Sequence, residues 1–175
     1  MMQRRAGSSA SSSPGSARSG RAVAIADLAA LDAFAAKLAA RAQQSDVFAL
    51  SGELGAGKTT LVRAFLAALA CREGVAPPAE VPSPTFTLVQ SYDIGSFSVS
   101  HFDLYRLKAP EEALELGIED AVADGIALIE WPDRLGPYLP RDRIAVDLAI
   151  EEEGRRRAEV RAFGRAAARH PELFA

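Results

Sequence analysis

A glycine-rich stretch with one lysine and two threonines, GELGAGKTT at residues 52–60, has the residue types and spacing needed to hold a phosphate group. It matches the P-loop pattern G-x-x-x-x-G-K-[ST]. Glycines let the backbone wrap around an anion and turn successive N–H groups towards it. Lys58 adds a positive charge for the β- and γ-phosphates, and the Thr59 hydroxyl can bind Mg²⁺. The stretch therefore predicts a site for a nucleoside triphosphate.

The surroundings of this motif decide between that site and an ordinary glycine-rich turn. The motif follows the apolar run VFAL at 47–50, which is typical of a strand buried on both faces. It precedes apolar residues at helical spacing from Leu61 to Leu69, which stop before Gly74. A phosphate-binding loop needs this order of strand, loop and helix. The residues expected to contact the nucleotide are Gly52, Glu53, Leu54, Gly55, Ala56, Gly57, Lys58, Thr59 and Thr60.

Two acids lie where they could complete such a site. Glu130 follows the apolar run 126–129, so we expect it at the carboxyl end of a buried strand, where open α/β sheets bind ligands. There it could ligate Mg²⁺ or orient water, although an ordinary acid at a strand end would look the same. In HFDLYR, alternation places His101, Asp103 and Tyr105 on one face of a strand. Asp103 could act near Mg²⁺ or on an attacking water, and the alternative is a solvated face.

A hydroxyl in a stiff loop is the remaining candidate. The segment SPTF at 83–86 follows the predicted helix, and its proline holds the backbone extended. P-loop NTPases carry a γ-phosphate-sensing segment at this place, which makes Thr85 the candidate hydroxyl. A tight turn into the next strand is an equally good interpretation of these residues.

The rest of the sequence supplies the elements that must position these side chains. Strands are predicted at 23–25, 86–92, 97–107, 143–150 and 156–163, a helix at 27–42 with Asp27 as N-cap, and a short helix from Pro110 to Gly117. Together they predict an α/β, P-loop NTPase-like three-layer domain with a central mixed, mainly parallel sheet and antiparallel hairpins. Its expected limits are residues 21–164, between a disordered tail at 1–20 and a C-terminal tail at 165–175.

Composition narrows the class of protein. A net charge of -3 provides no overall basic field for nucleic acid. Cys71 is the sole cysteine and cannot form an internal disulfide, which favours a reducing compartment. The first 20 residues lack the apolar core of a signal peptide, and no apolar run approaches membrane-spanning length. We therefore expect a cytoplasmic protein with no membrane contact.

Four segments in this order, GELGAGKTT, SPTFTLV, HFDLYRL and IEWPDRL, resemble the TsaE (YjeE) family of bacterial P-loop ATPases, and the resemblance covers about residues 22–163. It implies ATP and Mg²⁺ as cofactors and a role in making threonylcarbamoyladenosine at adenosine 37 of tRNAs that read codons beginning with A. In that family TsaE is an ATP-driven accessory of the TsaD–TsaB complex and does not perform the transfer. Contact with tRNA is then expected to be indirect, through the complex.

The resemblance also implies roles for single residues. Residues 54–60 would hold the phosphates, and Thr59 and Glu130 would bind Mg²⁺. Asp103 would be the essential acid and Thr85 the switch hydroxyl. The expected catalytic residues are therefore Lys58, Thr85, Asp103 and Glu130.

Less sharply marked positions complete the implied nucleotide site. Trp131, which position alone would assign to packing, matches a Glu-Trp pair that lies close to the nucleotide in the family. Residues 25–27 and 154–155 are implied neighbours of adenine and ribose, without a distinct motif. The arginines at 155–157 otherwise look like a solvated turn beside the acids at 151–153.

Other functions remain open at this point. A small-molecule or nucleotide kinase could use the same P-loop, although such kinases usually close an arginine-bearing lid over the phosphates. A regulatory GTPase is disfavoured because the chain contains no asparagine for an N-K-x-D motif. A nucleotide-binding scaffold without turnover would tolerate the loss of Asp103 and Glu130.

Overall fold

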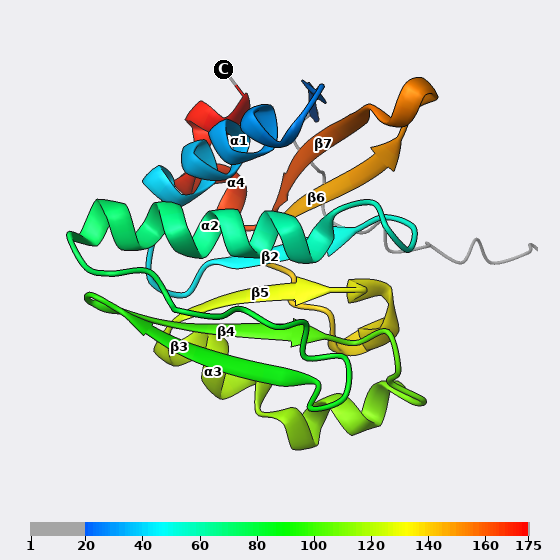
Figure 1. The fold of residues 1–175 in the computed structure, drawn as a ribbon. Helices are drawn as coiled ribbons and strands as arrows, with labels where there is room; N and C mark the ends of the chain where they lie inside the picture. Colours follow the sequence, from blue (N-terminus) through cyan, green and yellow to red (C-terminus); the bar gives the residue numbers. More distant parts are fainter. Residues whose placement is uncertain (1–19, 175) are drawn as a thin grey trace, which may run out of the picture.

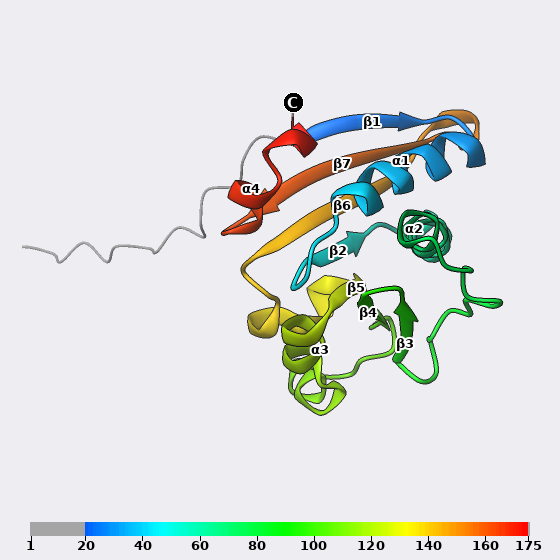
Figure 2. The same cartoon turned by 90° about the vertical axis from the view of Figure 1, so that its left-hand side faces the viewer.

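The computed structural model describes residues 20–174, which form one sheet with helices on both faces (Figures 1 and 2). The predicted disordered tail, except for Gly20, lies outside the described residues. The elements are β1 (Arg21–Ile25), α1 (Leu28–Arg41), β2 (Val47–Ser51), α2 (Lys58–Glu73), β3 (Val89–Ile94), β4 (Phe97–Asp103), α3 (Ile118–Asp124), β5 (Ile126–Glu130), β6 (Arg143–Ile150), β7 (Arg156–Phe163), α4 (Ala166–Arg169), and the 3₁₀ helices η1 (Pro110–Leu116), η2 (Pro132–Tyr138), η3 (Glu152–Gly154) and η4 (Pro171–Phe174). No helix within this part of the chain is long and apolar enough to cross a membrane.

The sheet has the strand order β1-β7-β6-β2-β5-β4-β3 and is mixed, as predicted. Its four inner strands β6, β2, β5 and β4 are parallel, whereas the other three pairings are antiparallel. Parallel pairing is thus confined to the centre of the sheet and makes up half of the pairings. Because β2, β5 and β4 run in the same direction, their carboxyl ends lie along one edge (Figure 1). The loop of residues 52–57 continues from β2 at that edge.

Alternation along the inner strands explains the three layers. In β5, Ile126 and Leu128 pack in the cluster that contains the apolar sides of α1 and α2. The intervening Ala127 and Ile129 pack with Ile118 of α3 in a second cluster on the opposite face. Both faces of the strand are therefore buried, as its continuous apolar run predicts.

Local signals set the ends of the helices that flank β2. Asp27 caps α1 as predicted, because its Oδ1 accepts a hydrogen bond of 2.8 Å from the Ala30 N–H. Gly74 ends α2 with a φ of 68°, a left-handed conformation that glycine adopts without strain.

Two predicted strand ends need correction, and one helix was missed. The strand expected from residue 86 begins at Val89, since the Leu88 N–H bonds to the Pro84 carbonyl at 2.6 Å and closes a turn. Leu88 has a φ of 65°, which a continuous strand would not allow. The strand expected to reach residue 107 ends at Asp103. The helix α3 was not predicted, because it has only seven residues and follows Gly117 directly.

Residues 165–174, which the sequence assigns to a tail, form α4 and η4. Ala166 and Ala167 are buried in the same cluster as α1, and Leu173 packs against it. His170 is fully buried beside Asp46, the residue that immediately precedes β2. The segment therefore packs against the domain and touches the amino end of its central strand.

Candidate nucleotide site

The sheet face beneath α2 changes from apolar to polar towards the carboxyl ends of its strands. Val99 of β4 and Ile126 of β5 pair at the apolar end, and Asp103 pairs with Glu130 at the other. His101 lies between Val99 and Asp103 on the same face because side chains alternate along a strand. His101 is 0 % exposed, Asp103 4 % and Glu130 2 %, which excludes a solvated face. Three titratable side chains are thus held under the start of α2.

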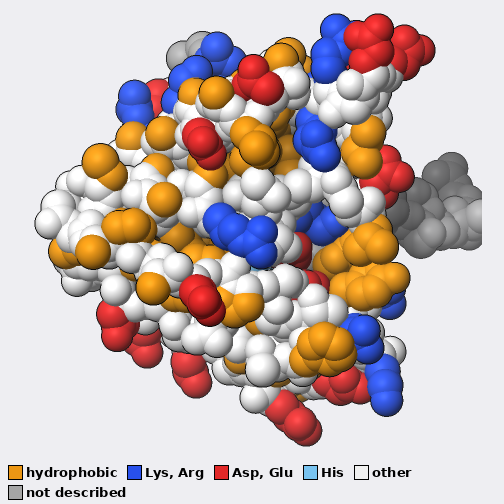
Figure 3. Space-filling model, in the orientation of Figure 1, with side chains coloured by type: hydrophobic (Ala, Val, Ile, Leu, Met, Phe, Trp, Pro, Cys, Tyr) orange, Lys and Arg blue, Asp and Glu red, His pale blue; other side chains and the backbone are white. Residues whose placement is uncertain are grey.

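A cleft of about 340 Å³ opens above these side chains. It is lined by Leu54, Gly55, Gly57, Lys58, Thr59, Thr60, Ser83, Thr85, Asp103, Tyr105, Arg106, Glu130, Trp131 and Arg156. In the space-filling view, acidic side chains lie within a hollow on the right-hand side, with basic and hydrophobic side chains around it (Figure 3). The structure therefore brings together most of the expected site residues from five separate segments.

Two glycines give the loop its path. Gly52 has a φ of 142°, and a Cβ there would lie 2.4 Å from the Leu148 carbonyl oxygen, so a larger residue would push the loop off β6. Gly57 has a φ of 103° and is the N-cap of α2. The loop therefore delivers the amino end of a 16-residue helix directly to the cleft, where backbone N–H groups and the helix dipole favour an anion.

Lys58 points into this loop. Its Nζ donates to the carbonyl oxygens of Gly52 at 2.7 Å and Glu53 at 2.9 Å, and it lies 4.0 Å from the centroid of the Trp131 ring. Burial lowers the pKa of Lys58, while the nearby Glu130 and Asp103 carboxylates act in the opposite direction. The lysine is thus held by neutral acceptors that a phosphate oxygen could replace.

Thr59 and Glu130 face each other as predicted from their positions. The Thr59 hydroxyl donates to Glu130 Oε1 at 2.8 Å and lies 3.1 Å from Oε2. His101 Nε2 lies 2.8 Å from the same Oε1 and holds the carboxylate from below, while its buried Nδ1 has no hydrogen-bond partner among the described residues. Within residues 20–174 no cluster of three or more His, Cys, Asp or Glu could hold a metal ion. The oxygens of Thr59 and Glu130 are of the type that Mg²⁺ binds, and an ion held by this pair would have to take its other ligands from phosphate and water.

Asp103 is tied to the loop that follows α2. Its Oδ2 accepts hydrogen bonds from the hydroxyls of Ser83 at 2.8 Å and Thr85 at 2.9 Å. Its Oδ1 accepts from the backbone N–H of Tyr105 at 3.2 Å. The loop containing Thr85 is therefore attached to the end of β4, beside Glu130. A movement of the Asp103 side chain would directly disturb the hydrogen bonds that hold this loop.

Trp131 occupies an unusual backbone position next to Glu130. Its φ of 58° lies in the left-handed region, which costs a bulky side chain about 1 kcal/mol or more. The conformation allows its N–H to bond to the Leu50 carbonyl at 3.2 Å. Its ring lies 4.9 Å from that of Tyr105 and beneath Lys58. The residue therefore packs and lines the cleft at the same time.

Some expected neighbours are placed differently, and some cleft residues were missed. Residues 25–27 and 154–155 do not line the cleft, whereas Arg156 does. In a run of three arginines the sequence gives no signal to select the middle one. Arg106, whose guanidinium carbon lies 4.6 Å from the centroid of the Phe86 ring, was also missed, because a strand continuing to residue 107 would place it on the face opposite Asp103.

The strand β2, the glycine loop, the helix α2 and the acid at the end of the adjacent strand β5 place the chain among P-loop α/β proteins. Comparison with known families gives the particular group. The chain belongs to the TsaE family, whose profile, described as "Threonylcarbamoyl adenosine biosynthesis protein TsaE", matches residues 25–158. This family is involved in the biosynthesis of tRNA threonylcarbamoyladenosine.

Individual proteins show the same relationship. The chain is similar to "tRNA threonylcarbamoyladenosine biosynthesis protein TsaE" from Rickettsia felis, with 40 % identity over 69 % of this chain and 68 % of that protein. The protein of the same name from Haemophilus influenzae is 43 % identical over 61 % of this chain and 64 % of its own length. The crystal structure of Bacillus subtilis YdiB is similar with a TM-score of 0.70 and 27 % identity, covering 89 % of this chain and 94 % of that one. The fold and the family are thus supported independently.

Proposed function

We propose that this protein is an ATPase that assists threonylcarbamoylation of adenosine 37 in tRNA by acting on a TsaD–TsaB complex. The observation that carries the proposal is the hydrogen-bonded pair of Thr59 and Glu130 beside Lys58, at the mouth of a glycine loop. This arrangement offers a phosphate a charge, backbone donors and an oxygen pair for Mg²⁺. The assignment to tRNA modification follows from the family.

Residues 54–60 would hold the phosphates of ATP, with Lys58 leaving its carbonyl acceptors for phosphate oxygens. Thr59 and Glu130 would hold Mg²⁺, which supplies positive charge to the phosphates when bound. His101 would keep the Glu130 carboxylate turned towards Thr59. The chain thereby provides a preformed site whose groups need little rearrangement.

Asp103 and Thr85 would act on the attacking water. Asp103 lies next to Glu130 across the β4–β5 pair and already accepts hydrogen bonds from Ser83 and Thr85. A water at the γ-phosphate would find an acceptor in Asp103 and a hydroxyl in Thr85. Because the same hydrogen bonds fix the loop, hydrolysis and loop position would be linked.

Exposed apolar side chains at the cleft support a protein partner. Leu54 in the glycine loop is 73 % exposed, Phe86 in the loop after α2 is 82 % exposed, and Tyr105 is 40 % exposed. Exposed apolar groups gathered at a site are typical of contact surfaces. A partner that covers them would hold both loops and exclude water, so hydrolysis by the isolated protein is expected to be slow. Contact with tRNA would be made through that partner, and the free, exposed Cys71 suits the reducing cytoplasm.

The decisive experiment measures ATP binding and phosphate release by the protein with Mg²⁺, with and without purified TsaD and TsaB. We expect ATP to bind to the protein alone, phosphate release to rise when the partners are added, and no phosphorylated acceptor to form. A phosphorylated acceptor would identify a kinase. Fast turnover that the partners leave unchanged would remove the accessory role.

A matched variant tests the site itself. Lys58→Ala should lose triphosphate binding, because the phosphate charges lose their nearest cation. Lys37→Ala, a change at an exposed residue of α1, serves as the control with the same change of charge. Equal ATP affinity in the Lys58 variant and the control would refute the assignment of the glycine loop.

A further inference from the structure

We propose that Arg156 is a positioning residue of the glycine loop, which holds the loop's outward carbonyl groups so that the Gly57 N–H faces a bound phosphate. The inference rests on the proposed function, since it assumes that the loop binds a nucleotide. Arg156 begins β7, on the hairpin that follows β6, and reaches the loop from outside the strand-loop-helix unit.

The contacts of Arg156 are all with carbonyl oxygens. Its Nε donates to Ala56 at 3.1 Å, its Nη2 to Gly55 at 3.4 Å and its Nη1 to Gly154 at 3.1 Å. No carboxylate lies within ion-pair distance of this guanidinium in the described part of the chain. Its charge is therefore directed to the dipoles of the loop and is not neutralised by an acid.

The adjacent arginines are used differently. Arg155 lies 3.7 Å from Glu153, and Arg157 lies 3.1 Å from Glu151. Both are exposed, whereas Arg156 is partly buried and lines the cleft. Of the three consecutive arginines, only the middle one is thus oriented towards the loop, because side chains alternate along β7.

The geometry of the peptide unit explains what this contact achieves. In a trans peptide the C=O and N–H groups point in opposite directions, and the described residues contain no cis bond. Holding the Ala56 carbonyl towards Arg156 therefore turns the Gly57 N–H away from Arg156. The Ala56 N–H already donates to the Glu53 carbonyl at 3.1 Å. The N–H group that the arginine orients towards a ligand is therefore that of Gly57, in the Ala56–Gly57 peptide unit.

Such an anchor is useful because the loop is rich in glycine. Gly55 and Gly57 have φ values of 82° and 103°, and glycine passes between positive and negative φ with little penalty. A peptide between flexible residues can turn over and present a carbonyl to the phosphate. The forked guanidinium binds two successive carbonyls at once, which a lysine ammonium on its flexible stem does less well.

The experiment compares Arg156→Ala, Arg156→Lys and the matched control Arg157→Ala. It measures affinity for ADP and for a non-hydrolysable ATP analogue with Mg²⁺, the kcat of hydrolysis at saturating ATP with TsaD and TsaB, and thermal unfolding. We expect Arg156→Ala to lower both affinities about 10-fold, since one hydrogen-bonded anchor of the loop is lost. Saturated kcat should change less than about 3-fold. Arg156→Lys should recover only part of the affinity, and Arg157→Ala should match the wild type.

Each alternative role has its own signature. Unchanged affinity with a lower unfolding temperature would make Arg156 merely structural. Lower kcat with unchanged affinity would place it on the transferred phosphate, and full recovery by lysine would reduce its role to charge; each of these results overturns the proposal. A wild-type protein that binds neither nucleotide would instead overturn the proposed function, which keeps the two failures distinct.

Discussion

Two buried pairs of histidine and carboxylate lie at opposite ends of the central parallel strands. At the carboxyl ends, His101 Nε2 lies 2.8 Å from Glu130 Oε1, and at the amino ends His170 Nε2 lies 2.9 Å from Asp46 Oδ2. All four residues are at most 2 % exposed. Their chemistry is nearly the same, so their surroundings must determine what each pair does.

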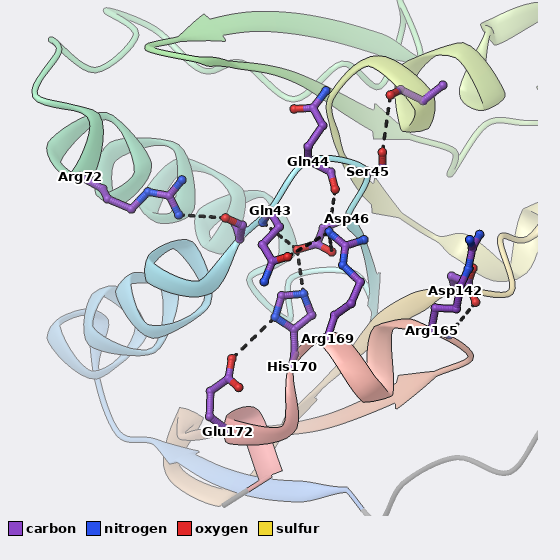
Figure 4. Close-up of polar contacts among 12 residues, drawn as sticks. Gln43, Gln44, Ser45, Asp46, Arg72, Asp142, Arg165, Arg169, His170 and Glu172 are labelled. Carbon is purple, nitrogen blue, oxygen red and sulfur yellow. Dashed lines mark hydrogen bonds and ion pairs between the residues drawn. The ribbon is translucent and has the colours of Figure 1, made fainter.

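The pair at the amino ends is enclosed by the protein, and Figure 4 shows the further polar partners that lie around it. Asp46 Oδ2 also accepts a hydrogen bond of 2.8 Å from the Gln43 N–H, and Oδ1 lies 3.3 Å from Arg169 Nη2. The same Arg169 nitrogen donates to the Gln44 carbonyl at 2.7 Å. His170 and Asp46 are close but not aligned for a hydrogen bond. These contacts join the C-terminal segment to the start of β2, a structural role.

The pair at the carboxyl ends remains open on one side. Glu130 shares its oxygens with the Thr59 hydroxyl, and both residues line the cleft. No guanidinium or ammonium forms an ion pair with Glu130 within residues 20–174. The surroundings of a buried carboxylate therefore separate two roles. Where its remaining partner is a movable hydroxyl at a cleft, the carboxylate is a candidate for catalysis or metal binding. Where the protein itself supplies the counter-charge, the carboxylate has a structural role.

The largest expected effect breaks the open pair. Glu130→Gln keeps the shape of the side chain and an acceptor for Thr59 but removes the negative charge. We expect kcat for ATP hydrolysis to fall about 100-fold to 1,000-fold, as when one charge-stabilising group of an active site is lost. Hydrolysis in the presence of TsaD and TsaB and the unfolding midpoint in urea should be measured together. Normal turnover in a folded variant would show that Glu130 has no catalytic role.

The next prediction concerns the enclosed pair. Asp46→Ala removes the buried carboxylate that lies in ion-pair range of His170 and Arg169 and accepts from the Gln43 N–H, and should lower the free energy of unfolding by about 3 kcal/mol. Asp46→Asn, which retains an oxygen acceptor, should lose less. Urea unfolding provides the stability, and turnover per folded molecule should equal that of the wild type. If nucleotide affinity fell in the folded Asp46 variants, the two ends of the sheet would be coupled and the contrast would fail.

A smaller effect is expected at the edge of the open pair. Thr85→Val preserves the branched shape but deletes one hydroxyl donor to Asp103, leaving Ser83 in place. We expect kcat to fall about 10-fold, the equivalent of one hydrogen bond. Ser83→Ala provides the comparison, because its hydroxyl binds the same oxygen from a more exposed position. Identical small losses of kcat in both variants would mean that either hydroxyl can hold the loop. Thr85 would then have no catalytic role that Ser83 lacks.

Features formed by residues close together in the sequence could be predicted, whereas most contacts between distant residues could not. The order of β2, glycine loop and α2 is contiguous, and the placement of Glu130 opposite Thr59 followed from a strand end alone. The strands β6 and β7 were found at their observed limits because their alternation is regular. Local patterns therefore sufficed for the framework and for the acids on it.

The remaining features depend on contacts that local patterns do not encode. The approach of Arg156 to Ala56 joins residues 100 positions apart, and its neighbours in sequence are also arginines. The turn that delays β3 overrides the strand preference of Phe86 and Thr87 through the left-handed Leu88. The contact of His170 with Asp46 likewise joins distant parts of the chain, so local patterns in the sequence do not reveal it.

The smallest predicted effect is the uptake of a proton by the open site when a nucleotide binds. The enclosed site should take up no proton. Burial lowers the pKa of Lys58 in the free protein, and a bound phosphate should raise it, because opposite charge favours the protonated form. Nucleotide binding should therefore take up protons at a pH between the two pKa values, and affinity should fall as the pH rises through that window. Calorimetry in two buffers of different ionisation enthalpy would measure the uptake. Lys58→Arg, whose guanidinium stays protonated, should bind with no uptake from this position, whereas Asp46→Asn should show the wild-type uptake. If Lys58→Arg retained the full proton uptake, another group would take up the proton. Lys58 would then no longer distinguish the open pair from the enclosed one.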